Sequence, residues 1–385
     1  MRQRLIFTLV VYLVNKVFIT LPALYAVSRN PALLKHKSLL SFLLVENLSR
    51  WDSTWYAKIA RTGYDLYTAA FFPLYPFLMR LFSHWTHLGI IQSGILISNV
   101  CFLMVLWFAY GLFRVDFNER ETKRIIWLMA LFPTSYYFSA VYTESLFALF
   151  CVWMLYAMRT QTWWASGVSG FFASMARTMG VFLAVPFAFD YFGILRLRDL
   201  LRIHQKLRRN WGQFLWVVFI PLGLGVYMAY LHQRFGDPLA FSHAEHFWHR
   251  SFHNPMGTIV YGLQDYSRYI LHPDWKWKMF GYTLTHSLWV LALIGMILWS
   301  LFSLRISYWL VLVYSLLIPL SSPNFQGADY FMSITRYTLV VIPLYIALYL
   351  MLRRAKWLYM SFLTASSLFL MDLVYLWTVN AGFIA

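Results

Sequence analysis

The segment SRWDSTWYAKIARTGYD, residues 49–65, places a carboxylate among aromatic side chains in a chain that has few acidic residues. Asp52 is one of only 15 acidic residues in 385. If the segment is helical from residue 51, Asp52 shares one face with Trp55, Tyr56 and Ile59, at positions i, i+3, i+4 and i+7. Apolar surroundings disfavour the charged form of a carboxylate and therefore raise its basicity. This pattern makes Asp52 a candidate general base.

A purely structural role for Asp52 is also open. The sequence Ser49-Arg-Trp-Asp52 matches S-x-x-[DE], a capping box in which the acidic side chain accepts a hydrogen bond from the Ser49 amide at the start of a helix. Acidic residues are common in the first turn of a helix because they oppose its dipole. The pattern by itself does not separate a helix cap from a catalytic base.

The composition indicates which kind of protein positions this segment. The chain is 60% hydrophobic and only 12% charged, whereas about a quarter of the residues of a soluble domain are charged. Apolar runs long enough to cross a bilayer recur throughout, so we expect one all-α polytopic membrane domain over residues 1–385, with about 10 to 12 transmembrane helices. The predicted spans are 5–27, 89–113, 122–140, 141–158, 162–178, 179–194, 211–233, 284–303, 306–321, 337–352 and 357–379.

Charge sets the expected orientation of these spans. Lys and Arg residues crowd into short loops, which by the positive-inside rule are cytoplasmic together with the N-terminus. Two long connections, residues 28–88 and 234–283, then lie outside, and their many Trp, Tyr, His and Pro residues suit the membrane interface. We expect interfacial helices in the first of them. The net charge of +17 does not indicate nucleic-acid binding, because no soluble basic domain is present to carry it.

Four segments, in this order, resemble the GPI mannosyltransferase II family, PIG-V, and more closely its shorter bacterial homologues. The first is RWDSTWYAKIARTGYD followed by AFFPLYP, similar to the W-D, I-A-x-x-G-Y and A-F-F-P-x-x-P pattern of that family. The other three are FPTSYYFSAVYTESLFALF (132–150), MARTMGVFLAVP (175–186) and SITRYTLVVIPLYIA (333–347). The loop GDPLAFSHAEHFWHRSFHNP (236–255) also looks like one found in bacterial members.

The resemblance implies a multi-pass enzyme of the GT-C glycosyltransferase fold in the cell membrane, or in the endoplasmic reticulum of a eukaryote. Such an enzyme transfers a sugar, typically mannose, from a polyprenyl- or dolichyl-phosphate donor to a lipid-linked or glycan acceptor on the extracytoplasmic face. Asp52 aligns with the catalytic Asp of the family and is the expected base of an inverting reaction. One departure is that DLYTAAFFP lacks the acidic residue that eukaryotic members carry after Gly63-Tyr64.

A lipid-phosphate leaving group calls for cations, and guanidinium groups match phosphate oxygens bidentately. The candidates for the donor phosphate are Arg336, Arg177, Arg50, Arg250 and Lys58. The candidates for substrate binding are Trp51, Tyr56, Tyr64, Glu144, Trp248 and His246. Glu144 lies in an apolar segment, where an acid is either functional or paired. An ion pair between Glu144 and an arginine therefore remains an alternative to substrate binding.

Two further alternatives remain open. His243, His246, His249 and His253 recur at near-helical spacing and could hold a divalent metal, although no H-E-x-x-H motif is present. Because arginines can supply the cations that a lipid-monophosphate leaving group requires, we expect no metal and no other cofactor. The chain could also be a transporter or flippase of lipid-linked sugars, with Asp52 and Glu144 as gating charges. A transporter would carry its ionisable residues near the middle of the bilayer, whereas here most cluster at its outer boundary.

Overall fold

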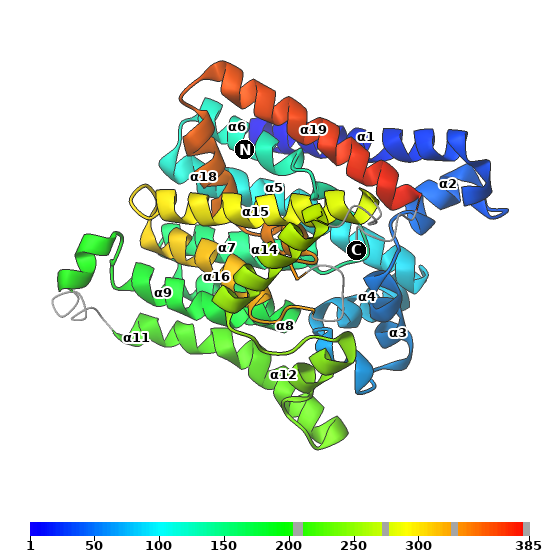
Figure 1. The fold of residues 1–385 in the computed structure, drawn as a ribbon. Helices are drawn as coiled ribbons and strands as arrows, with labels where there is room; N and C mark the ends of the chain where they lie inside the picture. Colours follow the sequence, from blue (N-terminus) through cyan, green and yellow to red (C-terminus); the bar gives the residue numbers. More distant parts are fainter. Residues whose placement is uncertain (203–210, 272–276, 325–329, 380–385) are drawn as a thin grey trace.

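The protein is an all-α assembly in the computed structural model, which describes residues 1–202, 211–271, 277–324 and 330–379 (Figure 1). Within these ranges the only β pairing is an isolated bridge between Arg250 and Asn324. Four helical stretches are long and apolar enough to cross a membrane: α1 (Arg2–Arg29), α5 (Ile90–Asp116), residues Trp211–Phe235 and α19 (Lys356–Thr378). The stretch Trp211–Phe235 comprises α11 (Trp211–Phe214), η7 (Leu215–Val218) and α12 (Phe219–Phe235). The predicted all-α membrane fold is confirmed.

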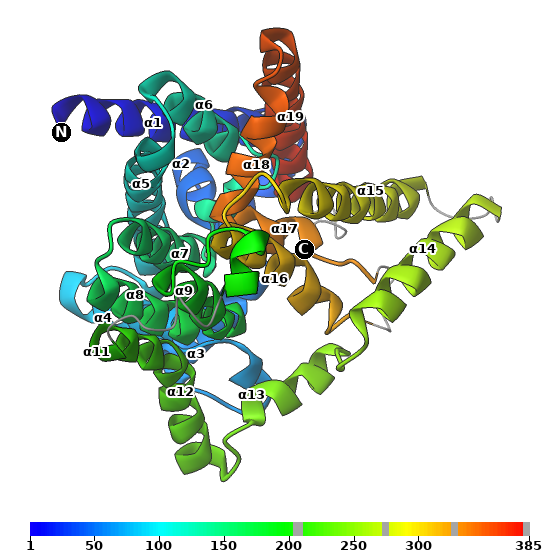
Figure 2. The ribbon, with the colours of Figure 1, turned by 90° about the vertical axis from the view of Figure 1, so that its left-hand side faces the viewer.

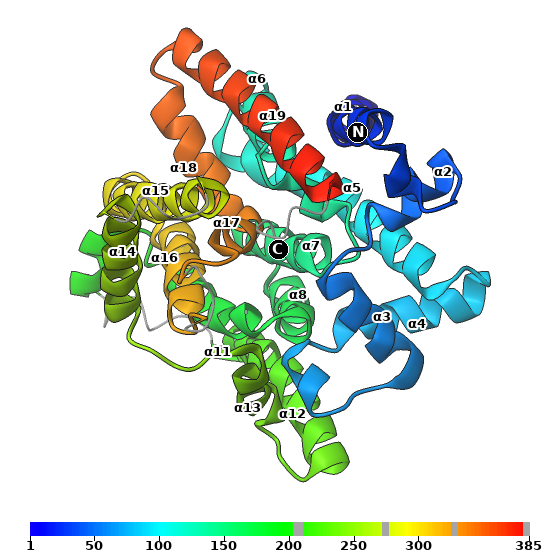
Figure 3. The ribbon, with the colours of Figure 1, turned by 45° about the vertical axis from the view of Figure 1, so that its right-hand side comes forward.

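Shorter apolar helices fill the space between the long ones. They are η5 (Thr178–Leu183) with α9 (Ala184–Tyr191), the stretch Leu284–Ser300 of α15 (Trp277–Ser300), α16 (Ile306–Leu320) and α18 (Ile342–Leu352). Figure 3 shows α7 (Glu144–Arg159) and α8 (Trp163–Ala176) near the centre of the bundle, and α7 packs against both α5 and α8. Nearly all residues of α7 are buried. Figure 2 shows α1 and α19 at one side of the bundle and α12 at the opposite side.

The predicted span over residues 122–140 is wrong. Helix α6 (Glu119–Ala130) ends before Pro133, whose ring and missing N–H prevent a helix from continuing. Residues 131–143 form turns and one short 3-10 helix, η4 (Ser135–Phe138), and all of them except Pro133 are buried. Non-helical backbone is tolerated at membrane depth where protein surrounds it. This irregular segment leads directly to Glu144, the first residue of α7.

The first long connection folds into short helices at one end of the bundle (Figure 1). They are α2 (Leu39–Ser41), α3 (Asp52–Thr62) and α4 (Leu74–Thr86). The predicted faces of α3 are confirmed, because Tyr56 and Ile59 are buried whereas Lys58 and Arg61 are exposed. Gly63, with φ at +83°, ends α3 in a conformation that favours glycine. The amphipathic pattern therefore fixes which side of α3 faces the protein.

The second long connection covers the first. It holds α13 (Ala240–His243), η8 (Ala244–Trp248) and α14 (Pro255–Leu271), and its residues 272–276 lie outside the described ranges. The ring of Trp248 lies 4.6 Å from that of Tyr67 and 5.3 Å from that of Trp55, between centroids. The indole of Trp248 also donates a hydrogen bond to the Tyr67 carbonyl, at 3.2 Å. One aromatic cluster thus joins the two loops beside α3.

We expect Trp377 to anchor the first loop to α19. Its buried indole lies 4.5 Å from the ring of Trp51 and donates a hydrogen bond to the Asn47 carbonyl. Trp377→Ala removes both contacts and leaves a cavity, which costs about 3 to 5 kcal/mol in comparable cores. Thermal melting of the protein in detergent should show a clear fall in Tm. Trp357→Ala is the matched control, because this tryptophan of α19 is 70% exposed; an equal fall in both variants would contradict the anchor.

Candidate active site

Asp52 begins α3, and its carboxylate is 28% exposed. The capping-box alternative is wrong, since the Ser49 amide donates instead to the Glu46 carbonyl and no side chain caps α3. Trp51, the residue before Asp52, has φ at +46°, a backbone region in which a bulky residue is strained. Ser333, which precedes the helix of Arg336, has φ at +65°. Asp52 and Arg336 form an ion pair, and the helix that carries each of them therefore begins next to a residue with a strained backbone.

A chain of ion pairs links Asp52 to the centre of the bundle. Arg336, in α17 (Ile334–Leu339), donates from Nη1 to Asp52 Oδ2 at 2.8 Å and from Nε to Glu144 Oε1 at 2.6 Å. Arg177, at the end of α8, donates from Nη2 to the same Glu144 oxygen at 2.8 Å and from Nε to Thr143 Oγ1 at 3.0 Å. Glu144 is completely buried. One carboxylate at the start of α7 thus holds two arginines that come from distant parts of the chain.

A third arginine completes the cluster around Tyr337. The guanidinium carbons of Arg177, Arg336 and Arg250 lie 5.4, 5.6 and 5.9 Å from the centre of the Tyr337 ring. Arg250 is fixed by a 3.1 Å hydrogen bond from Nη1 to the Ser322 carbonyl. Guanidinium groups gather on an aromatic face because the ring carries negative charge there. The arginine cluster, defined here as Arg177, Arg250 and Arg336, therefore forms on one side of Asp52.

Charged side chains of both signs are crowded together at this site. Three guanidinium groups face the carboxylates of Asp52 and Glu144, and Glu245 lies beside Arg250. Burial raises the pKa of Glu245 above its ordinary value, and the nearby charge of Arg250 acts in the opposite direction. Among the described residues, buried Arg177 Nη1 and Glu144 Oε2 have no hydrogen-bond partner. A cluster of cations with a spare buried N–H suits an anionic group such as a phosphate.

The structure does not bring the other two predicted phosphate ligands to this cluster. Arg50 donates from Nη2 to the Thr378 carbonyl at 2.9 Å, at the end of α19. Lys58 pairs with Asp65 at 2.6 Å on the exposed side of α3. Burial acts to raise the pKa of the Asp65 carboxyl, but hydrogen bonds from Lys58 and Thr68 hold this pKa below its ordinary value. Both basic residues therefore have partners outside the arginine cluster: the partner of Arg50 lies in α19, and that of Lys58 lies within the first loop.

The predicted substrate-binding residues fall into two groups. Tyr56 lies next to the site, with its hydroxyl 3.5 Å from Thr143 Oγ1, and Trp51 packs on Trp377 beside Asp52. The others lie farther out. Tyr64 donates to the Phe71 carbonyl at 2.8 Å within a satellite core, Trp248 joins the two loops, and His246 is exposed. Glu144, the remaining candidate, is the buried centre of the ion pairs.

The predicted histidine set does not converge. Within the described ranges no group of three or more His, Cys, Asp or Glu side chains is arranged to hold a metal ion. His243 instead pairs with Asp237 through a 2.7 Å contact. His249 has φ at +56° and begins the turn that carries Arg250 towards Ser322. The near-helical spacing fails here because the chain leaves the helix after Trp248.

Three residues that shape the site were not singled out by the sequence. Thr143 holds Arg177, Tyr337 carries the three guanidinium groups, and Tyr142 lies with its ring 4.7 Å from the guanidinium of Arg336. Thr143 and Tyr337 directly adjoin the predicted site residues Glu144 and Arg336, and Tyr142 lies two residues before Glu144, within the segments YTESLF and ITRY. This closeness in sequence is the signal by which the three residues could have been predicted. The contacts themselves depend on how α7, α8 and α17 meet.

Comparison with known families gives one match. A family model described as mannosyltransferase (PIG-V) matches residues 2–266, more than two thirds of the chain, and this range includes Asp52, Glu144, Arg177 and Arg250. No curated protein matches the chain. No solved structure matches it either.

We expect Glu144 to be essential for the stability of the site. Glu144→Gln removes the counter-charge of two buried arginines, and breaking a buried ion pair in this way costs about 3 to 5 kcal/mol. Thermal melting in detergent should therefore show a large loss of Tm. Glu119→Gln is the control, because its carboxylate pairs with Lys123 on the surface of α6 and is 51% exposed. A Glu144→Gln protein that melts like the wild type would contradict this prediction.

Proposed function

The chain belongs to the PIG-V mannosyltransferase family, and from this premise we propose how it transfers a glycosyl group. The donor is a polyprenyl- or dolichyl-phosphate sugar, with mannose as the sugar. The acceptor is a lipid-linked or glycan hydroxyl. The reaction proceeds on the extracytoplasmic face with inversion, and Asp52 is the general base. The observation that carries the proposal is the Asp52 carboxylate, 28% exposed, held beside a partly buried arginine cluster.

The proposed step requires a proton acceptor on one side of the sugar and cations on the other. The acceptor oxygen attacks the anomeric carbon and gives its proton to Asp52, while the bond between that carbon and the phosphate oxygen breaks. Its electron pair stays on the oxygen, so the product is a lipid phosphate. Arginines stabilise the charge that develops there. A single carboxylate suffices, in contrast to the paired acids of glycoside hydrolases.

Arg336 links the proposed proton acceptor, Asp52, to the cations proposed to bind the phosphate. Its guanidinium binds Asp52 and Glu144 at once. A donor phosphate competes with Asp52 for the Nη1 donor, whereas Glu144 keeps hold of Nε. Binding of the donor thereby releases the Asp52 carboxylate from its ion pair with Arg336, and the freed oxygen can accept the proton of the acceptor hydroxyl when the sugar is in place. This arrangement limits proton abstraction before the donor is bound.

The proposed orientation follows from the positive-inside pattern of the loops and remains part of the proposal. Asp52 and α3 occupy one end of the bundle, and the short basic loops occupy the other (Figure 1). With the N-terminus in the cytoplasm, the end with α3 faces outward. The transporter alternative lacks support, because the family to which the chain belongs is one of glycosyltransferases.

We predict that Asp52→Asn abolishes transfer. Loss of a general base lowers a rate by about 100- to 10,000-fold. The assay follows label from polyprenyl-phosphate [³H]mannose into the lipids and glycans of membranes that contain the protein. Asp65→Asn is the matched control, since this carboxylate of the same loop pairs with exposed Lys58. Transfer at the normal rate by folded Asp52→Asn protein would remove Asp52 as the base.

We predict that Arg250→Lys weakens donor binding. The substitution keeps a positive charge but loses the planar fork of donors that matches phosphate. A lost charged hydrogen bond of about 1.5 to 3 kcal/mol raises the KM for the donor by roughly 10- to 150-fold. Arg234→Lys, an exposed position near the end of α12, is the control and should keep the wild-type KM. An unchanged KM in Arg250→Lys would exclude Arg250 from the donor site.

A further inference from the structure

A cavity lies at the far end of the bundle from Asp52. It measures about 330 Å³ and is bounded by the end of α5, the segment after α9, the turn before α16 and α18. Helix α7 runs from Glu144 at the active site to Arg159, which pairs with Asp116 of the cavity wall. A helix of this length, 16 residues, spans about 22 Å. The cavity is therefore separate from the arginine cluster.

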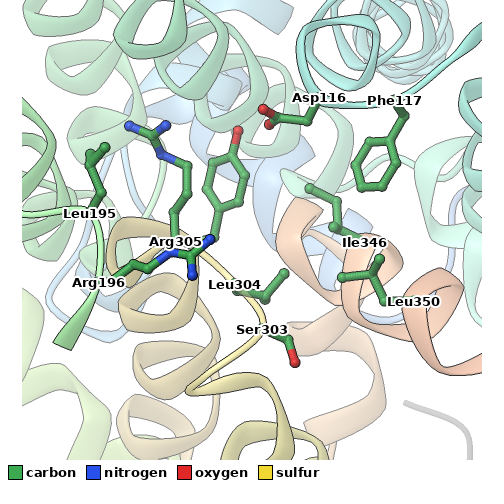
Figure 4. A pocket seen from close by; sticks show the side chains of 10 residues that line it. Asp116, Phe117, Leu195, Arg196, Ser303, Leu304, Arg305, Ile346 and Leu350 are labelled. Carbon is green, nitrogen blue, oxygen red and sulfur yellow. The ribbon is translucent and has the colours of Figure 1, made fainter. Parts of the chain in front are cut away.

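The walls of the cavity differ in chemistry. Figure 4 shows Arg196 and Arg305 on one side and Phe117, Ile346 and Leu350 on the opposite side. Ser303 and Tyr308 add hydroxyl groups to the lining. A ligand that fits both walls has a polar, anionic part and an apolar part.

The environment of Tyr308 is the strongest evidence that the cavity binds a ligand. Its side chain is only 3% exposed, and its hydroxyl has no hydrogen-bond partner among the described residues. A buried hydroxyl without a partner costs free energy comparable to a lost hydrogen bond. Nearby Arg305 Nε is also buried without a partner within the described ranges. Two hydrogen-bond donors at this cavity are thus left for a molecule other than the protein chain.

The remaining charges favour an anion. Arg305 pairs with Asp190 Oδ1 at 2.7 Å, and Asp116 pairs with Arg159, so each of these acids has an arginine partner, although buried Asp190 Oδ2 has no hydrogen-bond partner among the described residues. Arg196 is exposed and forms no ion pair with any described residue. The cavity therefore keeps a net positive charge beside hydroxyl donors, which is the chemistry that recognises a phosphate group.

The rim of the cavity points to a lipid as the source of that phosphate. Phe302, next to Ser303, is 76% exposed, and Leu197, next to Arg196, is 42% exposed. Exposed apolar side chains beside arginines suit the boundary between acyl chains and headgroups. Basic pockets between membrane helices on the cytoplasmic side bind the headgroups of phospholipids. We propose that this cavity binds the phosphodiester headgroup of a membrane phospholipid, independently of the transfer reaction.

Thermal melting of delipidated protein in detergent tests the proposal. The probes are dioleoyl phosphatidylglycerol, dioleoylglycerol and inorganic phosphate, each titrated separately. We expect phosphatidylglycerol to raise Tm and the other two probes to leave it unchanged. Equal stabilisation by dioleoylglycerol would overturn the phosphate requirement, and equal stabilisation by inorganic phosphate would overturn the lipid assignment.

Two variants identify the site. Tyr308→Phe removes only the unpartnered oxygen, and Arg196→Gln removes an exposed charge, so both proteins should fold. Each should need about tenfold more phosphatidylglycerol for the same stabilisation, a factor that corresponds to about 1.4 kcal/mol. The matched controls are Tyr314→Phe, also on α16, and Arg198→Gln, in the same connecting segment. Wild-type lipid dependence in both test variants would overturn the proposal.

Discussion

The buried carboxylate of Glu144 is the interaction on which the site depends. A charge without access to water is costly unless other charges and hydrogen bonds compensate it. Glu144 meets this requirement with two guanidinium groups, from the end of α8 and from α17. Because Arg336 also reaches Asp52, the same network fixes the start of α3. Four segments far apart in the sequence therefore meet where one acid is neutralised.

This arrangement prepares the site for an anion. The arginine cluster is held in position by Glu144, Thr143 and the Tyr337 ring, so its geometry does not have to form when a phosphate arrives. Preorganised charges of this kind lose little to reorganisation during a reaction. The strained backbones of Trp51 and Ser333 lie at the two ends of the Asp52–Arg336 ion pair. Strain of this kind persists only where the surrounding packing maintains it, and Trp377 supplies that packing for Trp51.

Ion pairs between acids and arginines occur at both ends of the bundle. At one end Glu144 and Asp52 hold arginines at the candidate active site, and at the other end Asp190 and Asp116 hold Arg305 and Arg159 beside the cavity. Helices α7 and α16 connect the ends through apolar, buried residues. Ionisable side chains thus concentrate where the helices begin and end, and the bundle interior between them is packed with aliphatic and aromatic residues.

The sequence by itself determined the class of the protein, its long apolar helices and the buried face of α3. It also predicted Asp52, Arg177, Arg250 and Arg336 as site residues, and the fold brings these four together. These predictions rest on local composition, periodicity and motifs, which need no partner segment. Tertiary structure decided the rest. Arg50 and Lys58 carry the right charge but meet Thr378 and Asp65 instead, and Pro133 turns an apparent span into the buried segment before Glu144. Contacts such as Thr143 with Arg177, or Tyr337 with three guanidinium groups, arise only when distant helices pack, because a linear pattern holds no information on their relative placement.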